Sequence, residues 1–158
     1  MAYDAQDDGR RDFHFLYGRW RVAHRRLRRR GVGCVEWDSF TGTAFCQGLM
    51  GGLCNVDEND LGEGRQGLTF RSFDVEKQQW SIYWVDATCG ALEAPVHGRF
   101  EGRTGRFEGD DVCDGRPVKV AFLWEILTDG AARWSQSFSY DGGQSWEANW
   151  IMDFTRTA

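Results

Sequence analysis

Short segments in which polar and apolar residues alternate run through most of this chain, and they restrict its fold more than any other feature. Successive side chains of a β-strand point to opposite faces, so a two-residue period predicts a strand with one buried face. Only 2 prolines interrupt these segments, whereas 20 glycines separate them. The longest apolar stripe comprises Val118, Val120, Phe122, Trp124 and Ile126, and shorter stripes lie within 20–24, 68–73, 80–85, 96–101, 134–138 and 146–154. The sequence therefore predicts an all-β protein.

The number of strands favours a closed sheet. About nine to ten strands with frequent turn signals are typical of an antiparallel sandwich or barrel. Closure removes the exposed strand edges, so we expect an up-and-down antiparallel barrel. A short helix is expected around Asp7 to Tyr17, where Phe13, Leu16 and Tyr17 share one face. Because no linker or long repeat divides the chain, residues 1–158 are expected to form a single lipocalin-like domain.

Several classes of protein are excluded by simple patterns. No apolar run approaches the ~18 residues that cross a bilayer. The polar N-terminus also lacks the apolar core of a secretory signal, so we expect a cytoplasmic protein without a membrane partner. The five cysteines form no CxxC pair, which predicts free thiols, no metal site and no cofactor. They are Cys34, Cys46, Cys54, Cys89 and Cys113.

Charge is divided unevenly along the chain. Residues 1–30 contain nine arginines and four aspartates, whereas the whole chain has a net charge of −5. Most of the basic residues form one cluster: Arg25, Arg26, Arg28, Arg29 and Arg30. A nucleic-acid surface needs a basic face that is not opposed by the rest of the protein. We therefore interpret the cluster as exposed charge at the end of a hairpin, and we expect no nucleic-acid partner.

Two short motifs have structural interpretations. Gly18-Arg19-Trp20 resembles the G-x-W motif that begins the first strand of the lipocalin and fatty-acid-binding (calycin) proteins. In that superfamily an arginine after the last strand lies over the tryptophan, and Arg156 stands at the matching place. The segment Ser139–Trp146 resembles the Asp-box hairpin, in which an aspartate caps the amides of a tight turn. Both resemblances imply structure rather than catalysis.

The whole chain also resembles a bacterial family of calycin-type, lipocalin-like β-barrel domains of unknown function. The segments that carry this resemblance are Gly18–Trp20, Gly52–Asn59, Trp80–Trp84 and Asp141–Trp150. The resemblance implies the barrel fold and supplies no reaction.

Polar residues on inward-facing positions are the first candidates for a binding site. His24 shares the parity of Trp20, so it is expected to point into the barrel, either as a general base or haem ligand or as a hydrogen-bonded interior side chain. Asn55 and Asp57 lie at alternate positions with Asn59. These three side chains either bind the polar end of a ligand or cap a turn.

The register of the last hairpin decides a second group of candidates. If Ser139 pairs with Trp146, then Gln136 faces Asn149, and Phe138 faces Glu147. Together with Arg71 and Tyr83 these polar groups then lie inside an aromatic wall that includes Trp84 and Trp150. If the turn is one residue longer, the same polar groups face solvent.

Three functions remain open at this stage. The first is binding of a small, partly apolar molecule in the barrel. The second is a cofactor-free isomerase, dehydratase or cyclase that uses His24, Asp57 or Glu147 as acid or base. The third is a haem or nitric-oxide carrier with His24 or His97 as axial ligand. The expected ligand-binding residues are His24, Asn55, Asp57, Arg71, Tyr83, Trp84, Gln136, Glu147, Asn149 and Trp150.

We also expect a homodimer. Large apolar side chains occur on the parity opposite to the main stripes, and a barrel has only one inside. The residues concerned are Phe40, Phe73, Tyr83, Leu123 and Ile151.

Overall fold

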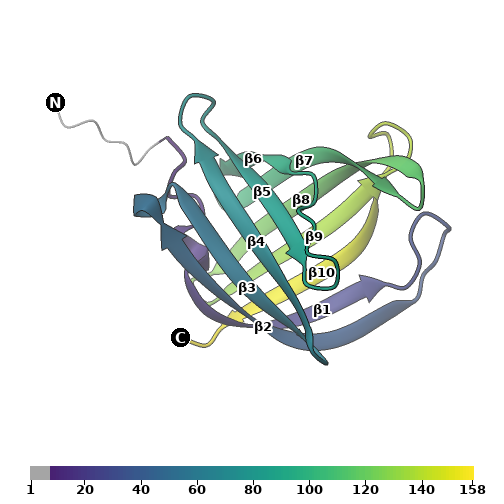
Figure 1. Cartoon of the computed structure of the whole chain (residues 1–158), viewed down its shortest axis with the longest axis horizontal. Helices are drawn as coiled ribbons and strands as arrows, with labels where there is room; N and C mark the ends of the chain where they lie inside the picture. The colour runs from purple at the N-terminus through teal and green to yellow at the C-terminus, as the bar shows by residue number, and fades with distance from the viewer. Residues whose placement is uncertain (1–7) are drawn as a thin grey trace.

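Ten antiparallel strands close into one barrel in the structure, a computed structural model that describes residues 8–158. The strands follow one another around the barrel in chain order, and β1 pairs with β10 to complete the ring (Figure 1). They are β1 (Gly18–Leu27), β2 (Trp37–Leu49), β3 (Cys54–Gly62), β4 (Arg65–Asp74), β5 (Gln79–Asp86), β6 (Val96–Glu101), β7 (Thr104–Cys113), β8 (Arg116–Thr128), β9 (Ala131–Ser139) and β10 (Glu147–Arg156). The predicted all-β, up-and-down barrel is confirmed.

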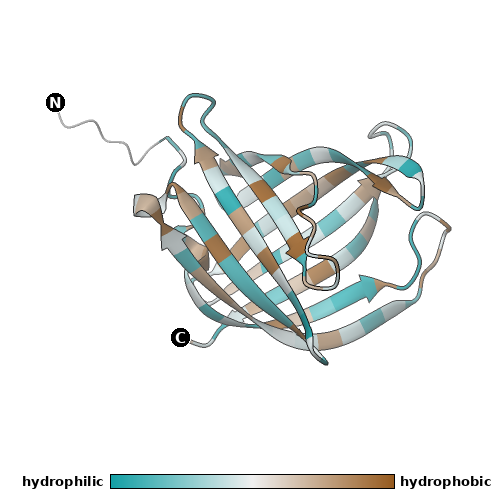
Figure 2. Cartoon of the chain, in the orientation of Figure 1, coloured by the Kyte–Doolittle hydropathy of each residue, from teal (hydrophilic) through white to brown (hydrophobic). Residues whose placement is uncertain are grey.

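The alternation of the sequence becomes the inside and outside of this barrel. Apolar and polar residues alternate along the strands in Figure 2. On β1, Trp20, Val22 and His24 are buried, whereas their neighbours Arg21 and Ala23 are exposed. The buried residues of all ten strands meet in one core, so the barrel interior is packed with side chains apart from the cavity described below.

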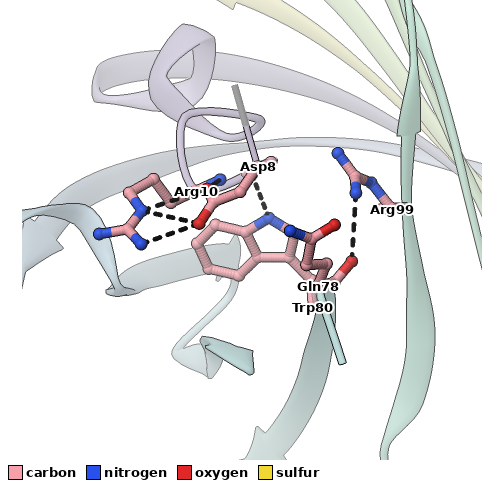
Figure 3. Close-up of polar contacts among 6 residues, drawn as sticks. Asp8, Arg10, Gln78, Trp80 and Arg99 are labelled. Carbon is pink, nitrogen blue, oxygen red and sulfur yellow. Dashed lines mark hydrogen bonds and ion pairs between the residues drawn. The ribbon is translucent and has the colours of Figure 1, made fainter. Parts of the chain in front are cut away.

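One end of the barrel is closed by the segment that precedes β1. Phe13 is fully buried, and its ring lies 5.1 Å from the ring of Trp80 and 5.3 Å from that of Phe100. The Trp80 indole donates a hydrogen bond to the carbonyl oxygen of Gly9 at 2.9 Å (Figure 3). Closely beside it, Asp8 and Arg10 form an ion pair at 2.8 Å. These contacts hold residues 8–16 across the opening as a plug.

The expected N-terminal helix is wrong in its extent. Between Asp8 and Tyr17 one turn of 3-10 helix forms, η1 (His14–Leu16), and Asp7 lies outside the described residues. A second such turn, η2 (Met50–Gly52), joins β2 to β3. The apolar residues that suggested a helical face, Phe13 and Leu16, are instead the two side chains that plug the barrel.

The G-x-W motif has the structural role that its resemblance implied. Trp20 is buried, and its indole donates to the Leu16 carbonyl at 2.8 Å. The Arg156 guanidinium carbon lies 4.2 Å from the centre of the Trp20 ring. Gly18 has φ of +113°, and a Cβ there would lie 2.8 Å from the Arg156 guanidinium, so both the backbone and the space require glycine.

The Asp-box segment forms the turn between β9 and β10. Asp141 accepts hydrogen bonds from the Ser139 hydroxyl at 2.8 Å and from the Ser145 amide at 2.9 Å. Bonds from Ser145, followed by that from Ser139, lower the pKa of Asp141 to about 2. Gly142 and Gly143 both have positive φ. The predicted turn is confirmed.

Part of the argument for a dimer is wrong. Phe40 stacks on the buried His24 ring at 4.5 Å between centroids, and Phe73 is 6% exposed within the core. Both therefore belong to the inside of the barrel. The remaining residues of that argument, Tyr83, Leu123 and Ile151, are partly buried on the opposite parity. The homodimer thus remains a prediction, and it now rests on these three residues alone.

All five cysteines are free. Within residues 8–158, no helix has the length and apolar character needed to cross a bilayer.

Candidate functional site

The barrel contains a cavity of about 230 Å³ at the end opposite to the plug. Its walls are dominated by large rings that stand edge-to-face. The Trp150 ring lies 6.1 Å from Trp84 at 88° and 5.6 Å from Trp134 at 85°. Such edge-to-face packing is favourable for aromatic pairs. The aromatic wall comprises Trp84, Phe122, Trp124, Trp134, Phe138, Trp150 and Phe154.

A glycine makes room for one of these rings. Gly67 on β4 pairs with Asp86 on β5, next to Trp84. A Cβ at Gly67 would lie 2.0 Å from the Trp84 ring, far inside van der Waals contact. The Trp84 indole therefore lies directly against the backbone of β4 at Gly67, a position that any side chain there would block.

A buried ion pair forms the inner end of the cavity. Arg71 on β4 donates to an Asp57 carboxylate oxygen at 2.7 Å, and the two side chains are only 3% and 5% exposed. Arg71 also donates to the side-chain oxygen (Oδ1) of Asn55 at 2.9 Å. The side-chain amide of Asn59 donates to the second Asp57 carboxylate oxygen at 2.7 Å. The predicted alternation of polar residues on β3 thus builds one network, which neutralises the charge of Arg71 and Asp57 internally.

Some donors of this region have no protein partner. The Arg71 Nε, the Trp124 Nε1 and the amide nitrogens of Asn55 and Asn149 are buried, and no acceptor among residues 8–158 is bonded to them. A buried donor left unbonded costs roughly 1–3 kcal/mol. An acceptor atom on a bound molecule would offset this cost for the donors that it reaches.

A β-bulge changes the predicted register of the last hairpin. Glu147 pairs with Phe138, as expected, but the register shifts between Ala148 and Trp150, so that Gln136 pairs with Trp150. Asn149 is the extra residue, and it turns inward together with Trp150. The side-chain oxygen of Asn149 still accepts a hydrogen bond from the side-chain amide of Gln136 at 2.8 Å. The predicted contact exists, although it is reached by a bulge rather than by regular pairing.

The structure brings half of the expected ligand-binding residues to the cavity. Asp57, Arg71, Trp84, Gln136 and Trp150 line it. Asn55 and Asn149 do not line the cavity themselves, but each accepts a hydrogen bond from a residue that does. Arg71 donates to Asn55, and Gln136 donates to Asn149.

The other three expected residues lie elsewhere. Tyr83 has the opposite parity to Trp84 and packs against Phe70, with 6.3 Å between ring centroids. Glu147 accepts a hydrogen bond from the Gly31 amide at 2.8 Å, which ties the β1–β2 connection to β10. His24 is buried in the wall but does not line the cavity.

His24 is held as a neutral side chain. Its Nδ1 accepts a hydrogen bond from the Trp150 indole at 3.0 Å. Burial, followed by the nearby charges of Arg26 and Arg65, lowers the pKa of His24 to about 4. His97 lies exposed on β6, with Nδ1 2.8 Å from the Ser81 hydroxyl. No histidine of residues 8–158 lines the cavity, so the geometry does not favour an axial haem ligand or a histidine base.

The far end of the cavity, here called the mouth, is charged. Two arginines line it, Arg26 on β1 and Arg30 in the β1–β2 connection. Three carboxylates line it as well: Asp86 on β5, Glu93 in the β5–β6 connection and Asp111 on β7. The wall is least regular here, because β5 pairs with β6 only through Trp80, Ser81 and Ile82. Residues 87–95 complete the wall, held by the Glu93 amide bonded to the Trp84 carbonyl at 2.9 Å.

Some of the lining residues were missed by sequence reasoning. Arg26 lies two residues after His24, so the alternation of β1 predicts that it faces inward. The neighbouring arginines led instead to the interpretation that the whole cluster is exposed. Thr69 shares the inward parity of Arg71 on β4. Glu93 and Ala94 lie in an irregular connection, for which the sequence period provides no signal.

No protein-family model matches the chain, and a search of curated proteins finds no match either. The fold and the cavity are therefore the basis for the functional argument.

Proposed function

We propose that the protein binds a small, flat, partly apolar molecule inside its barrel. The observation that carries the proposal is the cavity of about 230 Å³, with rings along its sides and a buried polar network at its inner end. Pockets for drug-sized ligands typically measure ~300–1,000 Å³. A ligand of one or two rings is therefore the size that we expect.

The chemistry of the lining supports the same proposal. Aromatic walls favour a flat body through ring packing and removal of apolar surface from water. At the inner end the Arg71–Asp57 pair is already neutralised, while the Arg71 Nε and the Trp124 Nε1 have no bonded acceptor in the part of the chain that the structure describes. An uncharged acceptor such as a carbonyl or hydroxyl oxygen suits that end. The closed barrel, the buried Trp20 and the Arg156 contact further support a likeness to the calycins.

Isothermal titration calorimetry with uncharged ring compounds tests the proposal. Benzamide and naphthalene-2-carboxamide both combine a flat ring with an acceptor oxygen. We expect at least one of them to bind with one-to-one stoichiometry and to change the fluorescence of the wall tryptophans.

A variant that fills the cavity controls for binding elsewhere. Val120 on β8 is buried and lines the cavity, so Val120→Phe places a ring in the space that the ligand needs. Leu123→Phe, on the opposite parity of the same strand, is the matched control. Binding should be lost in the first variant and retained in the second. Absence of binding to the wild type, or equal binding to both variants, would refute the proposal.

A further inference from the structure

Three arginines gather at the mouth of the cavity. Arg26 lies on β1, Arg30 lies in the β1–β2 connection and Arg65 begins β4; all three are partly buried. Arg26 and Arg30 line the cavity, and all three line the groove that adjoins it. Burial, followed by the positive charges of Arg30 and Arg65, lowers the pKa of Arg26, while Asp86 acts in the opposite direction. The charges of Arg30 and Arg65 thus act on Arg26, and all three side chains line the same groove.

Each of these guanidinium groups is held by an aromatic ring. The guanidinium carbon of Arg26 lies 4.3 Å from the centre of the Trp150 ring. The corresponding distances are 4.8 Å for Arg65 over Phe40 and 5.3 Å for Arg30 over Phe138. A guanidinium that rests on a ring by its flat face keeps its N–H edge available.

No carboxylate neutralises the three groups directly. Within residues 8–158, none of them has a carboxylate oxygen within the 4.0 Å of an ion pair. By contrast Arg28, on the same hairpin, pairs with Glu36 and Asp38, each at 2.8 Å. The partly buried arginines of the mouth therefore have unused capacity for an anion, whereas the exposed Arg28 is already paired.

The carboxylates of the mouth lie on other elements, and the nearby arginine charges act on two of them, Asp86 and Glu93. Asp86 accepts hydrogen bonds from the Thr88 amide at 2.9 Å and from its hydroxyl at 2.7 Å. Burial, followed by the charges of Asp111 and Asp86, raises the pKa of Glu93. Asp110 pairs with Lys119 at 3.3 Å. Among the unpaired residues that line the cavity, positive charge thus lies on the β1 side of the mouth and negative charge on the β5 to β7 side. The adjoining groove also contains three carboxylates: Asp38, which pairs with Arg28, and Glu63 and Asp114.

We infer that the molecule bound in the cavity is an organic anion, whose flat body lies between the rings and whose carboxylate is received by Arg26, Arg30 and Arg65. This inference rests on the proposed function and adds the ligand class. An organic cation is disfavoured because the Trp150 and Phe138 rings nearest the mouth already carry guanidinium groups. A carboxylate instead forms charge-assisted hydrogen bonds with guanidinium N–H groups. One N–H of Arg65 already donates to the Leu61 backbone carbonyl at 3.4 Å, whereas its buried Nε has no bonded acceptor among residues 8–158.

A matched pair of compounds tests the inference. Naphthalene-2-carboxylate and naphthalene-2-carboxamide have nearly the same shape and differ in charge. We expect the carboxylate to bind the wild type about tenfold more tightly than the carboxamide, a difference typical of one good charge-assisted contact. Added salt should weaken binding of the carboxylate and leave that of the carboxamide nearly unchanged.

Variants of the arginines locate the effect. Arg26→Gln, and independently Arg65→Gln, should reduce carboxylate affinity about tenfold without changing carboxamide affinity. Arg21→Gln removes the same charge from an exposed, outward position of β1 and should change neither affinity. Two variants and the salt dependence of the wild type keep the test decisive if one variant does not fold.

The outcomes separate the inference from the proposed function. Equal affinity for the two compounds, with no effect of either arginine variant, overturns the anion inference and leaves a binding barrel. Loss of carboxylate affinity in Arg21→Gln to the same extent as in Arg26→Gln also overturns it, because the effect is then only overall charge. Binding of neither compound overturns both proposals.

Discussion

Acidification should destabilise this barrel through the buried side chain of His24. His24 is 2% exposed, accepts a hydrogen bond from the Trp150 indole at 3.0 Å and stacks on Phe40. Protonation would remove that acceptor and place a charge in the wall near Arg26 and Arg65. For these reasons the pKa of His24 is lowered to about 4, with burial as the largest cause.

The sign of the effect follows from comparing the folded and unfolded chains. An unfolded histidine binds a proton near pH ~6.5, whereas folded His24 binds one only near pH 4. The unfolded chain therefore gains protons first, and the stability from neutral His24 is present above pH ~6.5 and lost as the pH falls towards about 4. Proton linkage gives a loss of about 2 kcal/mol between about pH 7.5 and about pH 5.

Urea unfolding followed by tryptophan fluorescence measures this loss. The comparison is between the wild type and His24→Gln, because the glutamine carbonyl can still accept a bond from Trp150 without titrating. The variant should be less stable at about pH 7.5, and the difference should shrink by about 2 kcal/mol at about pH 5. His14, whose pKa is also lowered by burial, and the carboxylates titrate in both proteins and cancel. Parallel loss of stability in the two proteins would refute the reasoning.

Other predictions concern packing, the ion pair, thiols and assembly. Trp20→Ala should cost about 3–5 kcal/mol in urea unfolding, as truncation of a buried aromatic does, and a loss under ~1 kcal/mol would contradict its role. Arg71→Met should cost about 3–5 kcal/mol because it strands a buried carboxylate, and adding Asp57→Asn should restore part of that loss; an additive double variant would count against the pair. A thiol reagent should modify exposed Cys89 at once but Cys46 only on unfolding, since burial raises the pKa of Cys46 to about 12. Sedimentation should reveal a dimer at high micromolar concentration, and a pure 18.1 kDa monomer would exclude it.

The barrel could be predicted because its physical cause is local. A two-residue period places every second side chain on one face, and strands such as β1, β3 and β4 follow that period closely. The contact of Arg156 with Trp20 was predicted instead from the resemblance to the G-x-W motif, because the two-residue period alone does not relate those two positions.

The candidate site was predicted less well, for identifiable reasons. Tyr83 and Trp84 are neighbours on β5, so they cannot both face inward on a regular strand, and the larger ring lies inside over Gly67. Asn149 faces inward only because a bulge adds one residue to β10. Arg26 has the inward parity of His24, yet the surrounding run of arginines suggested solvent. Bulges and irregular connections depend on contacts between distant strands, and the period of one strand does not encode them.

Closure of the ring also orders events in time during folding. Nine of the ten ladders join strands that are consecutive in the chain, and each can grow from a local hairpin. The ladder between β1 and β10 instead joins the two ends, with a hydrogen bond from Arg156 to the Tyr17 carbonyl across 139 positions. Because this ladder closes the longest loop, we expect it to form last and to be the slow step of refolding. Until then both end strands expose unpaired edges, so this interval is when neighbouring chains compete most strongly for them.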